Sequence, residues 1–176
     1  MKQFFIIFII FISCSPQTSS ELIESVDTTT EKNNDFLFIT PISCSATGEG
    51  CEMLYLKNAN KGYKDVENKD CNGSNIEFNF DKKYKFDFAV FVNFKDDKYK
   101  KSGKPKTLDI YVNESSVRAV ISSDTNFQDQ YVYFPEEWGY TDTVNLNFRN
   151  SYFDEENVEY CGVQNIFFYG YEYIDE

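Results

Sequence analysis

The chain has 176 residues, no histidine and a formal net charge of −12, which becomes −13 when the N-terminal segment carrying Lys2 is removed. The missing histidine argues against Ser-His-Asp and Cys-His hydrolases and against His-ligated zinc sites. The acidity argues against nucleic acid as a partner, because a phosphate backbone needs a basic face and no Arg/Lys-rich patch offsets the charge.

The chain begins with Lys2 and an apolar run from Phe4 to Ile12. This run is far shorter than the roughly 20 residues that a helix needs to cross a bilayer, so we interpret residues 1–13 as a signal peptide. The sequence FISC that ends at Cys14 resembles the lipobox of bacterial lipoproteins. The resemblance implies a lipid such as palmitate on Cys14 and anchoring in the bacterial cell envelope, at the outer membrane or the cell surface. An ordinary secretory signal with a chance cysteine is the alternative.

Residues 14–35 are polar and rich in Ser and Thr, without helical or strand periodicity. Such a composition cannot bury enough apolar surface to offset ordering, so we predict a flexible tether. Residues 36–176 remain, about 140 residues, which is enough for one domain with its own core. This part is rich in Phe and Tyr, with charged residues at short intervals, and that pattern favours strands over long helices.

Several segments alternate apolar and polar residues, as strands with one face in a core do. Residues 76–80 place Ile76, Phe78 and Phe80 on one face. The other expected core-facing residues are Phe86, Phe88, Val90 and Val92 in residues 86–94, Leu108, Ile110 and Val112 in residues 107–112, and Val144, Leu146 and Phe148 in residues 143–148. Further apolar segments occur at residues 36–42, 52–56, 117–121, 130–134 and 163–173. About nine strands separated by polar turns predict an all-β fold, an antiparallel β-sandwich or jelly roll.

With Cys14 assigned to lipid, four cysteines remain: Cys44, Cys51, Cys71 and Cys161. An even number in an exported protein indicates two disulfides, although the sequence leaves three pairings open. We favour Cys44 with Cys51 across a glycine-containing loop, which leaves Cys71 with Cys161. A four-cysteine zinc site is the alternative, but it lacks the usual C-x-x-C spacing.

The order of the segments from residue 76 onward resembles the discoidin-like, galactose-binding jelly roll. The matching parts are a polar turn at residues 81–84, strands at 86–94 and 108–115, and an aromatic ending at 166–170. Within that family the chain resembles most the NADase-type glycan-binding domain, named for the module attached to the streptococcal NAD glycohydrolase toxin. Its characteristic positions are matched here by Asn93, Tyr99, Lys104-Pro105-Lys106 and Tyr152.

The resemblance covers roughly residues 45–172 and implies sugar binding by loops at one end of the sandwich. Three positions depart from the family pattern: Lys104 replaces an Arg, Phe94 replaces a Gly, and Tyr160-Cys161 replace an Asp-Thr pair. The loop at residues 62–73 also lacks the usual Trp. The fold is therefore better supported than the sugar site.

Sugar recognition needs an aromatic face and polar groups that reach hydroxyls. The candidate ligand-binding residues are Tyr63, Asp65, Asn93, Lys104, Tyr152 and Asp154. For each one alone, a solvated loop residue is the simpler interpretation. Trp138 is a further aromatic candidate, but a Trp beside Pro and Gly more often closes the end of a core.

Two groups of acids near these loops could supply oxygen ligands to a structural calcium ion. They are Asp65, Glu67 and Asp70, and Asp154, Glu155 and Glu156, and neither has the spacing of a known calcium loop. We expect no catalytic residues and no other cofactor.

Three functions follow from this interpretation. The first is a lipid-anchored, non-catalytic envelope protein that binds glycan or a surface protein through its loops. The second is a structural or protein-interaction lipoprotein that keeps the fold without the sugar pocket, as Phe94 and Tyr160 suggest. The third is a glycosidase that uses a pair of carboxylates.

Overall fold

The computed structural model describes residues 36–57, 61–94, 101–121, 129–152 and 158–174. The expected signal peptide, Cys14 and the tether lie outside these residues, as does Tyr99. The described residues belong to one compact unit, Asn34–Glu176. No helix in the described part of the chain is long and apolar enough to cross a membrane.

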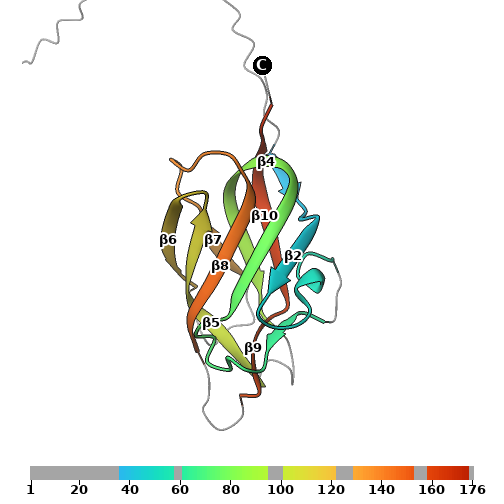
Figure 1. The fold of residues 1–176 in the computed structure, drawn as a ribbon, viewed down its shortest axis with the longest axis vertical. Helices are drawn as coiled ribbons and strands as arrows, with labels where there is room; N and C mark the ends of the chain where they lie inside the picture. The colour runs from blue at the N-terminus through green and yellow to red at the C-terminus, as the bar shows by residue number, and fades with distance from the viewer. Residues whose placement is uncertain (1–35, 58–60, 95–100, 122–128, 153–157, 175–176) are drawn as a thin grey trace, which may run out of the picture. The chain divides into compact units, whose positions relative to one another are not determined.

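Ten strands and one short 3-10 helix make up the described structure (Figure 1). Their bounds are β1 (Phe36–Ile39), β2 (Ser43–Ala46), η1 (Cys51–Met53), β3 (Tyr63–Asp65), β4 (Asn75–Val92), β5 (Ser102–Val112), β6 (Ser115–Val120), β7 (Gln130–Tyr133), β8 (Thr141–Tyr152), β9 (Tyr160–Val163) and β10 (Asn165–Glu172). The prediction of an all-β sandwich is therefore confirmed.

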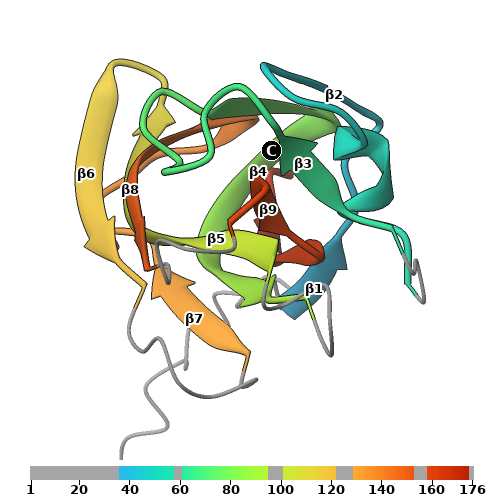
Figure 2. The ribbon, with the colours of Figure 1, turned by 90° about the horizontal axis from the view of Figure 1, so that it is seen from below.

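The strands form two layers that share the long strand β4. The first half of β4 pairs with β2 and β8, and β8 continues through β5 to β6. The second half of β4 lies between β10 and β7, and β1 borders β10. Figure 2 shows the layers from one end, with β1 and β7 on one side and β2 and β6 on the other. The short strands β3 and β9 lie at this end, where β9 pairs with β3 and runs parallel to the start of β5.

Aromatic side chains fill the space between the layers. Phe168 of β10 is fully buried, and its ring centroid lies 5.0 Å from Phe78, 5.4 Å from Phe80 and 5.6 Å from Phe86. Because β4 contributes to both layers, residues from its first half (Phe78, Phe80) and from its second half (Phe86) contact the same ring of β10. Truncating such a buried ring to Ala costs about 3 to 5 kcal/mol. The predicted core residues of β5 and β8 also face inward and are buried.

The second half of β4 differs from the prediction. A β-bulge leaves Asp87 unpaired, because Gly170 pairs with Phe86 while the preceding Tyr169 pairs with Phe88. One extra residue reverses the side-chain alternation beyond it. Ala89 and Phe91 therefore enter the core. The predicted inward orientation of Phe88, Val90 and Val92 is wrong, because these residues lie on the outer face, although Val90 is buried there.

Three further elements differ from the predictions. Residues 52–56 lie in η1 and the turn after it instead of a strand, because Cys51 is tied to Cys44 and the chain must reverse between β2 and β3. The segments predicted at residues 76–80 and 86–94 form one strand, since β4 continues through the exposed residues 81–83. The last segment forms two strands, β9 and β10, and the short strands β2 and β3 were missed.

The favoured cysteine pairing is confirmed. Cys44 is bonded to Cys51, and Cys71 is bonded to Cys161. The second bond closes a separation of 90 residues and joins the loop before β4 to β9. The bond therefore holds together two segments at the same end of the sandwich that are far apart in the sequence.

The outer faces of the two layers have opposite character. On the layer that contains β5 and β8, Asp109 accepts hydrogen bonds from Arg118 and Arg149, with Nε–O distances of 2.7 Å to each arginine. These are both arginines of the chain. The hydrogen bond from Arg118 is the main reason why the pKa of Asp109 lies below its ordinary value. The other layer exposes aromatic rings instead.

Candidate functional site

The end of the sandwich formed by β3, β9 and the loops around them contains most of the predicted site residues. Asp65, at the end of β3, is buried and accepts six hydrogen bonds. Its Oδ2 accepts from Thr47 Oγ1 (2.8 Å), Ser74 Oγ (2.8 Å), Asn68 Nδ2 (2.9 Å) and the Tyr63 hydroxyl (3.2 Å). Its Oδ1 accepts from the backbone N–H groups of residues 67 and 68 at 3.1 and 3.0 Å.

Burial alone would raise the pKa of Asp65, but the hydrogen bonds from Asn68, Ser74 and Thr47 outweigh it and hold the pKa below its ordinary value. Tyr63 is fully buried beside this carboxylate. A ligand in solvent cannot reach either side chain. The geometry therefore assigns Tyr63 and Asp65 to a structural network that ties β3 to its neighbouring loops, instead of the predicted ligand contact.

Phe94 and Tyr160, two of the residues that depart from the family pattern, lie against each other. Both are buried, and their ring centroids are 5.8 Å apart in a T-shaped arrangement. Lys64 Nζ lies 4.4 Å from the Tyr160 ring centroid and 5.9 Å from that of Phe94. Burial is the main cause of the raised pKa of Tyr160. The two rings lie against Gly162 of β9, which pairs with Lys64 of β3, and they cover this part of the β3–β9 ribbon.

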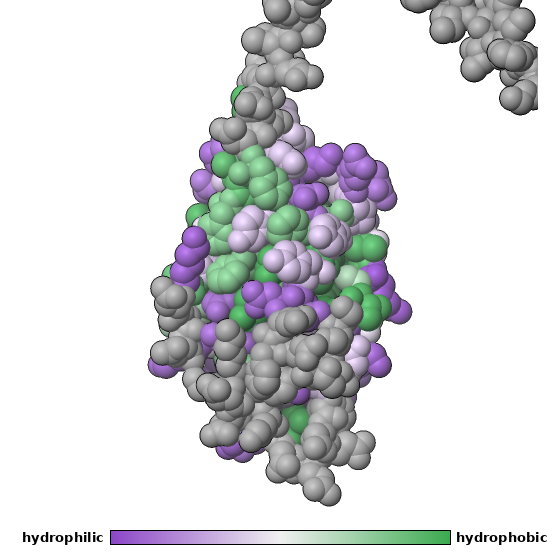
Figure 3. Space-filling view, turned by 180° about the vertical axis from the view of Figure 1, so that it is seen from behind, coloured by the Kyte–Doolittle hydropathy of each residue, from purple (hydrophilic) through white to green (hydrophobic). Residues whose placement is uncertain are grey.

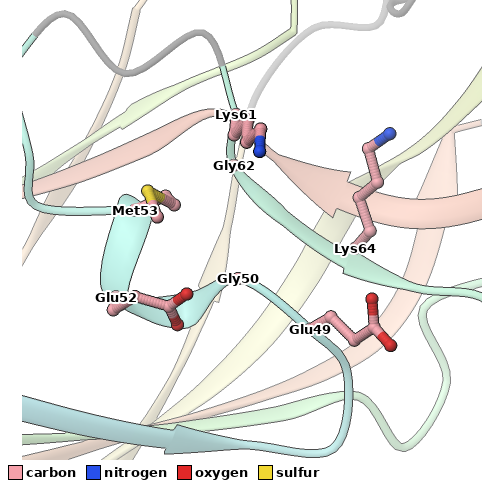
Figure 4. A pocket seen from close by; sticks show the side chains of 7 residues that line it. All are labelled: Glu49, Gly50, Glu52, Met53, Lys61, Gly62 and Lys64. Carbon is pink, nitrogen blue, oxygen red and sulfur yellow. The ribbon is translucent and has the colours of Figure 1, made fainter.

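A pocket of about 380 Å³ lies beside this aromatic pair. We call it the η1–β3 pocket, and its lining residues are Glu49, Gly50, Glu52, Met53, Lys61, Gly62 and Lys64. Figure 4 shows that they come from two arms, with residues 49–53 on one side and residues 61–64 on the other. The arms are joined by backbone hydrogen bonds between Glu49 and Lys64, at 2.8 and 2.9 Å.

Glycine allows these arms to approach. Gly50 has a φ of 79°, in the left-handed region that residues with a side chain rarely adopt. A Cβ atom at this position would lie 2.7 Å from the carbonyl oxygen of Gly62. A larger residue would therefore separate the two arms and open the base of the pocket.

The η1–β3 pocket balances its charges. Glu49 and Glu52 supply hydrogen-bond acceptors, and Lys61 and Lys64 supply donors. Met53 adds an apolar, polarizable side chain. A pocket with equal numbers of anionic acceptors and cationic donors suits an uncharged ligand with many hydroxyl groups better than an ion.

The remaining predicted residues do not line this pocket. Asn93 is buried just beyond the end of β4. Lys104 of β5 pairs with Tyr152 of β8, so these two are brought together, and Lys106 Nζ lies 4.9 Å from the Tyr152 ring centroid. Their role in ligand binding stays a prediction.

Trp138 and the proposed calcium ligands have different outcomes. Trp138 is buried against Phe134, with centroids 6.0 Å apart, and closes the core. Asp154, Glu155 and Glu156 lie outside the described residues. Within the described ranges, no group of three or more His, Cys, Asp or Glu side chains is close enough to hold a metal ion.

The sequence analysis missed the four charged residues of the η1–β3 pocket. Glu49, Glu52, Lys61 and Lys64 lie in two short stretches interrupted by Gly50 and Gly62. Glycines flanking charged residues in two segments were the available signal. Their proximity depends on β3 pairing with residue 49, which no local pattern predicts.

Comparison with solved structures identifies the fold. A family 32 carbohydrate-binding module (CBM) of NanJ from Clostridium perfringens, in complex with galactose, is 13% identical with a TM-score of 0.58, covering 77% of this chain and 99% of that one. CBM32-3 from a family 31 glycoside hydrolase of the same organism is 13% identical with a TM-score of 0.57, covering 75% and 90%. CpGH89CBM32-5, also from C. perfringens and in complex with GalNAc-β-1,3-galactose, is 11% identical with a TM-score of 0.56, covering 72% and 93%.

These likenesses establish the discoidin-like, galactose-binding jelly roll as the fold of this chain. No protein-family model matches the sequence. No curated protein matches it either.

Proposed function

We propose that the chain is a lipid-anchored, non-catalytic protein of the bacterial cell envelope that binds an uncharged sugar in the η1–β3 pocket. The fold carries this proposal, because it is shared with modules solved in complex with galactose and with GalNAc-β-1,3-galactose. The balanced charges of Glu49, Glu52, Lys61 and Lys64 agree with such a ligand. No aromatic ring lines the pocket, so we expect weak binding of a single sugar.

The anchoring part of the proposal is supported by the sequence FISC at residues 11–14 and by the polar segment after it. A lipid on Cys14 would hold the domain near a membrane, and two or three acyl chains would make the anchoring stable. The acidity of the mature chain would keep the displayed domain soluble.

A non-catalytic role is supported by the arrangement of the acids in the pocket. Glycoside hydrolysis needs two carboxyl groups on opposite sides of the scissile bond. Glu49 and Glu52 come from the same arm, while the other arm contributes lysines (Figure 4). This arrangement argues against the glycosidase hypothesis.

Calorimetry or a glycan array with the unit 34–176 tests the sugar-binding proposal, using galactose and GalNAc-β-1,3-galactose as first ligands. We expect Glu52→Gln and Lys61→Met each to weaken binding at least tenfold. Lys82→Ala, in the exposed ion pair with Glu172, is the matched control and should leave binding unchanged. If Glu52→Gln and Lys61→Met still bind sugar but Tyr152→Ala does not, the binding site lies at the predicted residues Lys104 and Tyr152 on β5 and β8 instead of in the η1–β3 pocket.

The second candidate is a structural or protein-interaction lipoprotein without a sugar site. The burial of Phe94 against Tyr160 favours it, because two packed aromatic rings stand at positions where the family pattern has a Gly and a polar residue. If the wild-type unit binds no sugar on a broad glycan array, this second candidate is supported and the sugar-binding proposal is overturned.

A further inference from the structure

The outer face of the layer β1–β10–β4–β7 is covered by aromatic rings. Its eight rings are Phe36 and Phe38 of β1, Phe167, Tyr169 and Tyr171 of β10, Phe88 of β4, and Tyr131 and Tyr133 of β7. We call this surface the aromatic face. Figure 3 views the molecule from behind, where green and pale side chains gather on one surface.

Strand register arranges these rings in rows. One row crosses all four strands through Phe38, Tyr169, Phe88 and Tyr133. The charges near the face are those of Lys85, which pairs with Tyr171, of the bulge residue Asp87, and of Lys57, whose Nζ lies over the Phe38 ring. The aromatic face is thus close to neutral in a strongly acidic chain.

The rings pack against one another and form a continuous cluster. The Tyr169 centroid lies 6.1 Å from Phe36 and 4.8 Å from Phe88, and the Phe36 and Phe88 centroids are 5.8 Å apart, so the three rings form a triangle. Each of the three rings is therefore in contact with the other two. Clustered rings of this kind pack well against other aromatic rings in tilted or edge-to-face contacts.

The solvent-exposed area of the aromatic face is large enough for a specific protein interface. Phe36, Tyr131 and Tyr133 are 47%, 57% and 67% exposed, and the other five rings are partly exposed. With about 200 Å² for each aromatic side chain, the accessible area of the aromatic face is roughly 500 Å² on one copy. A contact between two such faces would bury about 1,000 Å² in total, the lower limit for a specific protein interface.

The aromatic face has a projection and a recess on opposite flanks. Tyr131 projects from β7, in the same row as Val90 of β4 and Phe167 of β10. At the other flank a cavity of about 380 Å³, which we call the β1–β10 cavity, is lined by Phe38, Lys57, Val92, Gln164, Asn165, Phe167 and Tyr169. It is large enough for a tyrosine side chain, and Lys57 Nζ lies over the Phe38 ring at 4.4 Å.

We infer that the aromatic face is a homodimer interface, in which Tyr131 of each copy enters the β1–β10 cavity of the other. A two-fold axis parallel to the strands, between β10 and β4, places β7 of one copy opposite β1 of its partner at the same level. Two-fold dimers are the commonest assemblies of soluble proteins. Two acidic chains repel each other, so a nearly neutral face is where two copies can meet.

This symmetry also agrees with anchoring. A rotation about an axis parallel to the strands preserves their direction, so the Phe36 ends of both β1 strands lie on the same side of the dimer. Two copies attached through their N-terminal segments could then share one membrane. The dimer itself does not depend on sugar binding, because the η1–β3 pocket shares no lining residue with the aromatic face.

Sedimentation equilibrium of the unit 34–176 tests the inference. The core residues of the described part of the chain and both disulfides lie within this unit, so we expect it to fold on its own. We expect a monomer–dimer equilibrium in the micromolar range. Tyr131→Lys, which sets a second cation beside Lys57 of the other copy, should raise the dimer dissociation constant at least tenfold. Val120→Lys on β6, where Val120 is 63% exposed, is the matched control and should change nothing.

A charge exchange tests the pairing of the two sites. The double variant Tyr131→Lys/Lys57→Glu should dimerise more strongly than Tyr131→Lys alone, because the new charges attract across the interface. A wild-type unit that stays monomeric up to 0.5 mM, or a dimer insensitive to Tyr131→Lys, would overturn the inference. Binding of a monomeric unit to phosphatidylcholine vesicles through Tyr131 would also overturn it, and would assign the aromatic face to a bilayer.

Discussion

Tyr169 of β10 stacks on Phe88 of β4 with ring centroids 4.8 Å apart and an interplanar angle of 22°. This contact exists because the bulge at Asp87 turns Phe88 away from the core. Without the bulge, the alternation that begins at Phe86 would bury Phe88 and leave a gap in the aromatic face. One inserted residue therefore determines which aromatic side chains stabilise the core and which remain available for contact.

The bulge predicts a strict requirement for glycine at position 170. A Cβ atom there would lie 2.1 Å from the Lys85 carbonyl oxygen and 2.9 Å from the Phe86 Cα. Both are backbone atoms that cannot move alone, so we expect Gly170→Ala to lower the free energy of unfolding by at least about 2 kcal/mol. Denaturant unfolding measures this change.

Gly139→Ala is the matched control for this substitution. Nothing lies within 4 Å of a Cβ atom at position 139, so its effect should be close to zero. Equal stability of the two variants would mean that the strands at the bulge are not packed as described.

The two disulfides should differ in their contribution to stability. In the chain-entropy model, the bond Cys71–Cys161, across 90 residues, contributes about 4 to 5 kcal/mol, and the bond Cys44–Cys51, across 7 residues, contributes about 2 to 3 kcal/mol. Urea unfolding of the Cys71→Ala/Cys161→Ala and Cys44→Ala/Cys51→Ala variants compares them. A larger loss from the short loop would contradict the entropic account.

Asp65 should make the fold sensitive to acid. Its pKa is lower in the folded protein than the value of about 3.9 expected in the unfolded chain, so its carboxylate stabilises the fold above about pH 4. The stabilisation is lost as the pH falls below that value toward the folded pKa. We expect Asp65→Asn to cost about 2 to 4 kcal/mol at pH 7, because the buried donors lose their anionic partner.

Thermal unfolding of wild type and Asp65→Asn between pH 2 and pH 7 measures this dependence, and the difference should shrink below pH 4. Glu172→Gln is the control, since Glu172 forms its ion pair with Lys82 at the protein surface. Its cost should stay below about 1 kcal/mol. A constant difference for Asp65→Asn across the range would contradict the assigned role.

Lipidation of Cys14 can be tested in cells with a palmitate analogue. The full-length chain should take up the label, and Cys14→Ala should remove it, because the acylated cysteine is the proposed anchor. Cys44→Ala/Cys51→Ala is the control, since these cysteines form a disulfide and carry no lipid. A label that persists in Cys14→Ala would show that Cys14 is not the lipidated residue. Residues 1–13 would then be interpreted as an ordinary secretory signal.

The candidate site was only partly predictable from sequence. The resemblance to a glycan-binding family led to Tyr63 and Asp65, but polar loop residues look alike in sequence whether they face solvent or a buried network. The pairing of Glu49 with Lys64 joins segments that show no shared pattern, so the pocket between them was not foreseen. Phe94 and Tyr160, which depart from the family pattern in sequence, are brought into contact by the tertiary structure.

The sequence by itself determined the all-β class, the sandwich and the presence of two disulfides, because alternation with period 2 and an even number of cysteines can be recognised without knowing which segments meet. Only the tertiary structure decided which cysteines pair, which face of β4 points inward after residue 87, that residues 52–56 form a turn, and that eight aromatic rings share one surface. The physical reason is the same in each case. A bulge, a short crosslink and a strand register depend on partners distant in the chain, and their energies arise only after those partners meet.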